Sequence, residues 1–272
     1  MKRIASIVLS VLLLFPLIHI PESKEKTFGD GYNGASLESS VYTSIPFSTK
    51  EDEEISIEGG MPLYYNTSSR TNTCANVAGA ILLGYYDKTY DELIENFTAA
   101  RVIRGKVLYA KQTQAVENVM ARLYVTMKTN ITEGGTTIRN FKTGQQTYVN
   151  EQGRNISYRQ VIRDERLLDD PFRQAIQNEQ PIALFVSKYT LISTNALNAD
   201  TDREEFYKQL YVGDHIVICY GLRTIRYYDA SGKMTNELNL LLVATGYEHS
   251  PTGYILIDDY GTLVDGYSVE IY

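Results

Sequence analysis

Apolar residues in this chain change their spacing from helical to strand-like along its length. The pattern predicts helices at 74–86, 113–127, 141–149 and 171–178. The clearest helix repeats Ala78, Ile81, Leu82 and Tyr85 at i, i+3, i+4 and i+7, so one of its faces is built for burial. From position 182 onward, short apolar runs bounded by turn residues predict strands. These strands are expected at 182–186, 216–220, 238–244, 254–257 and 267–271.

Helices followed by antiparallel strands favour an α+β fold with a cleft between the two halves. Residues 60–272 are enough for one two-lobed domain. Residues 24–59 are polar and include the acidic run Glu51–Glu54, which predicts a flexible arm. A short pro-segment that blocks the cleft is the alternative for this arm.

The N-terminus has the pattern of an export signal. Lys2 and Arg3 precede an apolar run at 4–20, which predicts a signal peptide over residues 1–23 and a secreted or cell-surface protein. An uncleaved membrane anchor is one alternative, although Pro16 and Pro21 favour a signal that ends nearby. An intracellular protein with a buried N-terminal helix is the other.

The net charge and the motifs limit the kinds of partner molecule and cofactor that this chain is expected to bind. The formal net charge is −7 at pH 7, which argues against nucleic acid binding. We find no spacing typical of metal ligands and no phosphate-binding glycine loop, so no cofactor is expected. We expect a monomer that contacts a membrane only through an uncleaved N-terminal segment. Cys74 and Cys219 could form a disulfide in an exported chain. We interpret Cys219 as a small core residue instead.

Cys74 is the candidate nucleophile. It follows the polar turn Thr71-Asn72-Thr73 and opens the first predicted helix. The positive end of the helix dipole and the amide N–H groups of the first turn favour thiolate over thiol. The alternative is a buried cysteine that only packs, since free cysteines are often buried.

Two histidines are candidates for a general base. His215 stands at the mouth of a predicted strand, His249 lies in a polar turn, and His19 lies in the N-terminal apolar run. We favour His215 because a strand holds its backbone in place. Asp258 and Asp259 end a later strand, and a carboxylate there could orient the imidazole. Strand alternation allows only one of them to face His215.

Three segments together resemble a known family. They are Met61-Pro62-Leu63-Tyr64-Tyr65-Asn66 with the Cys74 helix and its terminal Tyr85-Tyr86, then Gly213-Asp214-His215-Ile216-Val217, and finally Ile257-Asp258-Asp259-Tyr260-Gly261. This order is similar to that of bacterial papain-like cysteine peptidases, near the double-glycine leader peptidases and their secreted relatives.

The resemblance implies a papain-like two-lobed fold, with the Cys helix in an N-terminal helical lobe and an antiparallel β-sheet in a C-terminal lobe. It also implies a triad of Cys74, His215 and Asp258, since Asp258 precedes Gly261 by three residues as the family's Asn precedes its Gly. Asn66 and Asn72 are candidate oxyanion-hole donors beside the backbone N–H of Cys74.

The chain also departs from the family. Ala75-Asn76-Val77 stand where the relatives carry Gly-Pro-Thr, Asp214 precedes His215 directly, and Tyr260 stands where an indole is common. These departures bear more on activity than on fold.

The predicted function is a secreted cysteine peptidase that hydrolyses peptide or amide bonds of a peptide or protein. Loops such as 188–209 would set its specificity. The alternatives are another thiol enzyme, either a peptidoglycan amidase or endopeptidase or a transglutaminase-like acyltransferase, and a non-catalytic surface-binding domain on the same scaffold. The 22 tyrosines are compatible with a binding surface.

Overall fold

The computed structural model describes residues 25–29, 36–131, 134–197, 202–257 and 260–272. The predicted signal peptide at 1–23 and both candidate carboxylates, Asp258 and Asp259, lie outside the described residues. The four predicted helices are confirmed, as α1 (Cys74–Asp87), α2 (Gln114–Thr126), α3 (Ile138–Glu151) and α4 (Asp169–Gln177).

One large antiparallel sheet dominates the described part of the chain. It has nine strands in the order β2-β10-β11-β12-β9-β13-β7-β8, with β3 paired to β10. Its strands are β2 (Ser36–Pro46), β3 (Thr49–Ser56), β7 (Ile156–Arg163), β8 (Arg166–Leu167), β9 (Ile182–Ile192), β10 (Arg203–Tyr228), β11 (Met234–Ala244), β12 (Thr252–Leu256) and β13 (Gly261–Ile271). Two small pairs complete the set: β1 (Thr27–Phe28) with β6 (Thr136–Thr137), and β4 (Ala100–Ile103) with β5 (Lys106–Tyr109).

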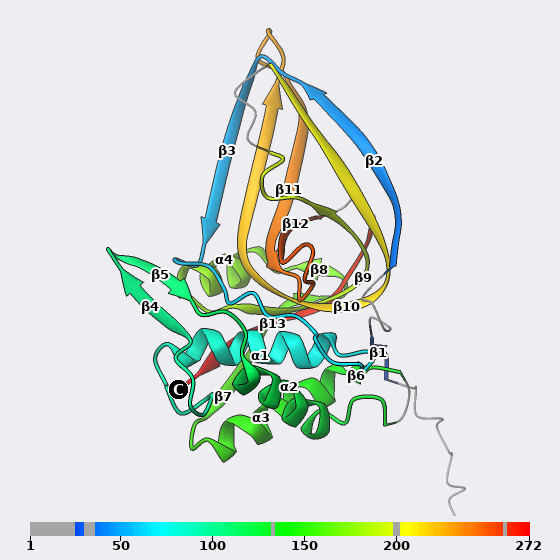
Figure 1. Cartoon of the computed structure of the whole chain (residues 1–272). Coiled ribbons are helices and arrows are strands. Elements are labelled where there is room, and N and C mark those ends of the chain that lie inside the picture. Colours follow the sequence, from blue (N-terminus) through cyan, green and yellow to red (C-terminus); the bar gives the residue numbers. More distant parts are fainter. Residues whose placement is uncertain (1–24, 30–35, 132–133, 198–201, 258–259) are drawn as a thin grey trace, which may run out of the picture.

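The longest strand, β10, organises this sheet. Its 26 residues pair with β2 and β9 in the first half and with β3 and β11 in the second. Because β11 pairs with β12 and β12 returns to β9, the strands β9, β10, β11 and β12 form a closed ring. Figure 1 shows this curved sheet rising above the helices.

Helices α1, α2 and α3 pack together beneath the sheet (Figure 1). Every residue of α1 from Cys74 to Tyr85 is buried, so the helix lies at the centre of the molecule rather than on its surface. Gly144 permits the close approach of α3 to α2, since a Cβ there would lie 2.5 Å from the backbone of Met127. The apolar face predicted for the Cys74 helix is therefore buried, and so is the rest of that helix except the half-buried Tyr86.

The predicted papain-like α+β fold with two lobes is wrong. Strands make up 45% of the structure and helices 21%, and the nine-stranded antiparallel sheet replaces a smaller β lobe. The extra strand content comes largely from β2, β3 and the first half of β10. β2 and β3 are mostly exposed, the first half of β10 is mostly half-buried, and polar residues interrupt all three, so they lack the apolar runs by which the other strands were predicted.

Two predictions of irregular structure also differ from the structure. Residues 36–56, expected to be part of a flexible arm, form β2 and β3 and pair with β10 over most of their length. Residues 188–209, expected to be a loop, include the end of β9 and the start of β10. The sheet thus crosses the boundary that we predicted before Gly60. None of the described helices is long and apolar enough to cross a membrane.

Candidate active site

Cys74 is the first residue of α1, as predicted. The carbonyl oxygen of Thr73 accepts hydrogen bonds from the N–H groups of Asn76 at 2.9 Å and Val77 at 3.0 Å, which starts the helix directly at the cysteine. Cys74 is a free thiol with 2% of its surface exposed. Its place at the positive end of a 14-residue helix favours the thiolate.

Cys219, the second free thiol, has a different environment. It lies within β10 with no exposed surface, and its Sγ donates to the carbonyl oxygen of Gly221 at 3.4 Å. Burial raises the pKa of the Cys219 thiol to about 12. Cys219 is therefore a core residue, as predicted.

His215 lies in β10 opposite Val186 of β9, and 1% of its surface is exposed. Its Nε2 atom lies 2.8 Å from the carbonyl oxygen of Thr245. A carbonyl oxygen only accepts, so Nε2 carries the proton of this bond, and in the neutral ring Nδ1 is then the basic nitrogen. A backbone carbonyl thus selects the tautomer of His215, a role that sequence analysis assigned to an aspartate.

Tyrosines enclose the His215 ring. Tyr247 stacks on it with 4.6 Å between centroids and 12° between planes, and Tyr189 stacks at 5.9 Å and 18°. The hydroxyl groups of these two tyrosines are 2.7 Å apart. Sequence analysis missed both: in the turn after β11 it considered only His249, which is exposed, and it placed Tyr189 in a loop at 188–209. Tyr260, which occupies the position of the family's indole, donates instead to Glu38 at 2.6 Å.

The turn after β11 connects His215 to the helix that begins at Cys74. Thr245 holds the imidazole, and the next residue, Gly246, packs against α1: a Cβ at Gly246 would lie 3.1 Å from Cγ1 of Val77. Val77 stands one helical turn after Cys74, on the same side of α1. The turn that contacts His215 therefore packs on the first turns of α1, close to the start of the helix at Cys74.

The N-terminal segment Glu25–Gly29 also packs near the start of α1 and near His215. Lys26 forms an ion pair with Asp214 at 2.9 Å, directly before His215. Phe28 is fully buried and its ring lies 5.1 Å from that of Phe185. A Cβ at Gly29 would lie 2.7 Å from Oδ1 of Asn72, two residues before Cys74. The segment thus contacts neighbours of both candidate catalytic residues.

The two candidate oxyanion-hole amides have other partners. Asn66 donates to the carbonyl oxygen of Arg70 at 3.1 Å and accepts from the N–H of Ser68 at 3.0 Å, so its amide closes its own turn. Asn72 donates to Oδ1 of Asn130 at 2.9 Å. A role for either amide in an oxyanion hole stays a prediction.

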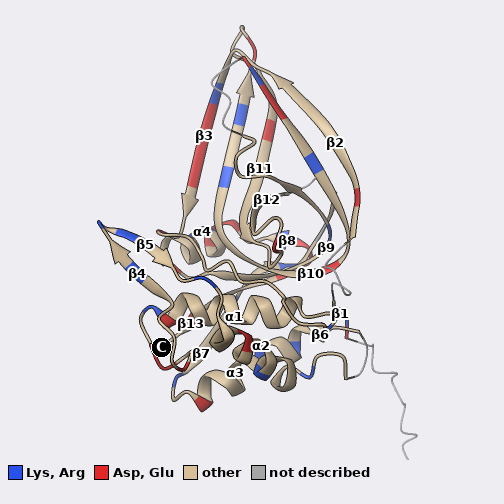
Figure 2. Cartoon of the chain, in the orientation of Figure 1, with Lys and Arg blue, Asp and Glu red and all other residues tan. Residues whose placement is uncertain are grey.

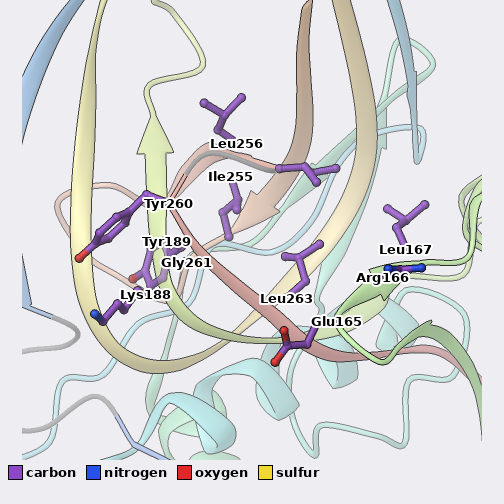
Figure 3. A pocket seen from close by; sticks show the side chains of 11 residues that line it. Glu165, Arg166, Leu167, Lys188, Tyr189, Ile255, Leu256, Tyr260, Gly261 and Leu263 are labelled. Atoms are coloured by element: carbon purple, nitrogen blue, oxygen red, sulfur yellow. The ribbon is translucent and has the colours of Figure 1, made fainter.

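Two cavities adjoin the site. One, of about 270 Å³, lies between the first turn of α1, the 66–70 turn and α2, and is lined by Thr73 and Asn76 among others. The other, of about 340 Å³, includes Tyr189, whose ring stacks on His215, and combines Leu256 and Leu263 with the charged residues Lys188 and Glu165. Figure 3 shows this second cavity and the side chains around it. The first cavity thus borders the start of the Cys74 helix, and the second borders a tyrosine that stacks on His215.

Among the described residues, no cluster of His, Cys, Asp and Glu side chains could hold a metal ion. No model of a known protein family matches the chain, and no curated protein matches it. The resemblance to bacterial cysteine peptidases stays a prediction that rests on the motifs alone.

Proposed function

We propose that this protein is a thiol hydrolase that cleaves peptide or amide bonds, with Cys74 as nucleophile and His215 as general base. One observation carries the proposal: a cysteine opens a buried helix, and a buried histidine of fixed tautomer is held by the turn that packs on that helix. A nucleophile and a base oriented by a third group form the usual arrangement of covalent hydrolysis.

The chemistry follows from the tautomer of His215. Nδ1 accepts the proton of the Cys74 thiol, and the thiolate attacks the carbonyl carbon of the substrate. The imidazolium then protonates the leaving amine as the C–N bond breaks, which leaves a thioester on Cys74. Water attacks the thioester while His215 takes its proton, and the acid product leaves with the thiol restored. Amide N–H groups at the start of α1 would stabilise the negative oxygen of each tetrahedral intermediate.

The group that orients His215 has two candidates. The carbonyl oxygen of Thr245 accepts from Nε2 in the structure. The family resemblance supplies Asp258 as the alternative or additional partner, and we keep it in the proposal. A carboxylate would also stabilise the imidazolium, which a neutral carbonyl does less well.

The substrate class that we propose is a peptide or protein outside the cell, in keeping with the predicted signal peptide. The two cavities beside the site offer pockets for side chains on either side of the scissile bond. The larger one combines apolar walls with charged residues, the usual composition of a specific pocket.

Access to the site must change for catalysis. Cys74 and His215 expose 2% and 1% of their surfaces. The contacts of Glu25–Gly29 with Asp214 and Asn72 support the view that the N-terminal segment acts as a pro-segment. The same burial favours the second candidate function, a non-catalytic binding domain, if no opening occurs.

Hydrolysis of fluorescently labelled casein by the purified protein tests the proposal. Cys74→Ala and His215→Ala should each lower turnover by about 10²- to 10⁴-fold or more. The matched controls Cys219→Ala and His249→Ala should keep most of the activity. If all four variants equal the wild type, the enzyme proposal fails and the binding domain is favoured. The same holds if neither the wild type nor Lys26→Ala, which loosens the N-terminal segment, cleaves casein or peptidoglycan fragments.

A second pair of variants tests the third group. Asp258→Ala should lower turnover more than Asp259→Ala, and it should leave more activity than Cys74→Ala because an orienting residue contributes less than the nucleophile. Circular dichroism checks that both variants are folded. Full activity in both would remove the carboxylate from the mechanism and leave a Cys74–His215 dyad.

A further inference from the structure

The hairpin formed by β4 (Ala100–Ile103) and β5 (Lys106–Tyr109) stands apart from the large sheet. Its two strands pair only with each other among the described residues, and they project from the body of the molecule in Figure 1. Arg104 and Gly105 both have positive φ, of 52° and 78°, which is typical of a tight hairpin turn. Val107, which pairs with Val102 close to the turn, lies against Gly59.

Large aliphatic side chains are exposed at the tip of this hairpin. Val102 is 71% exposed, Ile103 52% and Leu108 51%. A single exposed aliphatic residue is common on protein surfaces, but here three lie within one short hairpin. Such a group of exposed aliphatic side chains is typical of a surface that binds a partner.

The charge of the hairpin indicates what that occupant is. Arg101, Arg104, Lys106 and Lys111 lie in or next to it, and no Asp or Glu occurs between positions 96 and 116. The chain as a whole has a net charge of −7, so this is a local basic region on an acidic protein. Figure 2 shows basic residues at the hairpin. Within it, Arg101 pairs with Leu108 and Lys106 with Ile103, so cations and aliphatic groups share one face.

We propose that the tip of the β4–β5 hairpin docks on an anionic lipid surface. Ile103 and Leu108, which share a face with Arg101 and Lys106, would enter the boundary between headgroups and acyl chains. Val102, close to the turn on the other face, would enter beside them, while the arginine and lysine side chains contact lipid phosphates. A protein partner is disfavoured, since a stable interface covers about 800 Å² on each side and some 20 residues, more than this hairpin offers. Nucleic acid is disfavoured by the aliphatic tip, which offers no aromatic ring for base stacking.

The absence of tryptophan from the sequence makes a direct test possible. Val102→Trp in the full chain places the only indole at the hairpin tip. With phosphatidylglycerol vesicles we expect a blue shift of its emission of about 10 nm, as an indole moves from water into the interface. Phosphatidylcholine vesicles should give a much smaller shift. The readout is local, so binding through the N-terminal apolar run at 4–20 does not imitate it.

Two further variants control the test. Val125→Trp, at a residue of α2 that is 62% exposed, should show no shift with either vesicle. Adding Arg101→Gln and Arg104→Gln to Val102→Trp should abolish most of the shift. No shift for Val102→Trp, an equal shift with both lipids, or a shift that soluble polyglutamate reproduces would overturn the proposal. The last result would indicate an acidic protein partner instead.

Discussion

The imidazole of His215 lies flat against the ring of Tyr247, with 4.6 Å between the centroids and 12° between the planes. The carbonyl that accepts from Nε2 belongs to Thr245, two residues before this tyrosine. One turn thus fixes both the plane and the tautomer of the candidate base. It also packs through Gly246 on Val77 of the helix that begins at Cys74.

Removing the stack should impair the base without removing it. We expect Tyr247→Ala to lower kcat by about 10-fold or more and to change KM little, because the ring positions His215 rather than the substrate. Tyr247→Phe keeps the stacked ring and loses the contact with the Tyr189 hydroxyl, so it should stay near the wild type. Steady-state kinetics on a peptide substrate measures both. Equal losses in the two variants would show that the hydroxyl matters, not the stack.

The two cysteines should differ strongly in reactivity. Both thiols are buried, but Cys74 lies at a helix N-terminus, which favours its thiolate, whereas Cys219 lies within a strand, where burial raises its pKa to about 12. Iodoacetamide at mildly acidic pH should therefore modify Cys74 first, as read by mass spectrometry of the native protein. The same reaction in denaturant, where both thiols are exposed, is the control. Preferential modification of Cys219 in the native protein would contradict the assignment of the nucleophile.

Loosening the N-terminal segment should expose Cys74. Lys26→Ala removes the ion pair with Asp214, which is partly exposed and worth at most about 1 kcal/mol. We therefore expect alkylation of Cys74 to become about 2- to 5-fold faster. Lys233→Ala, at an exposed position of the β10–β11 turn, is the matched control and should have no effect. An unchanged rate in Lys26→Ala would show that the segment does not limit access.

Asp87 should make stability depend on pH. Burial raises the pKa of this carboxyl from 3.8 to about 6, although the N–H groups of Ile94 and Ala99 donate to it. A raised pKa in the folded state favours the protonated form. The contribution of Asp87 to the stability of the folded state is therefore fully present below about pH 4, and it is lost as the pH rises through 6.

The free energy of unfolding should accordingly fall by on the order of 1–2 kcal/mol between pH 4 and 7 because of Asp87. Urea titrations of the wild type and Asp87→Asn would measure this, and the variant should be less stable but show a smaller slope against pH. Asp164→Asn, at an exposed site between β7 and β8, is the control and should keep the wild-type slope. If the free energy of unfolding of Asp87→Asn depended on pH as steeply as that of the wild type, groups other than Asp87 would cause the dependence.

Local patterns in the sequence determined the four helices and the start of α1 at Cys74. Apolar spacing and a polar turn before the cysteine are properties of neighbouring residues, so they need no tertiary information. The strands with apolar runs, such as β11 (Met234–Ala244), followed from the same kind of signal. His215 was favoured over His249 for a local reason too, namely its place in a strand.

The tertiary structure alone decided the size of the sheet and the surroundings of His215. The mostly exposed, polar strands β2 and β3 are held by pairing with β10, whose residues lie more than 100 positions further along the chain. Such pairing depends on backbone hydrogen bonds between distant segments and leaves little periodic pattern when most of a strand is exposed. In the same way, the contacts of His215 with Tyr189, Tyr247 and the carbonyl oxygen of Thr245 join β9, β10 and the turn after β11. No spacing within one segment could reveal them, because they exist only where the folded strands meet.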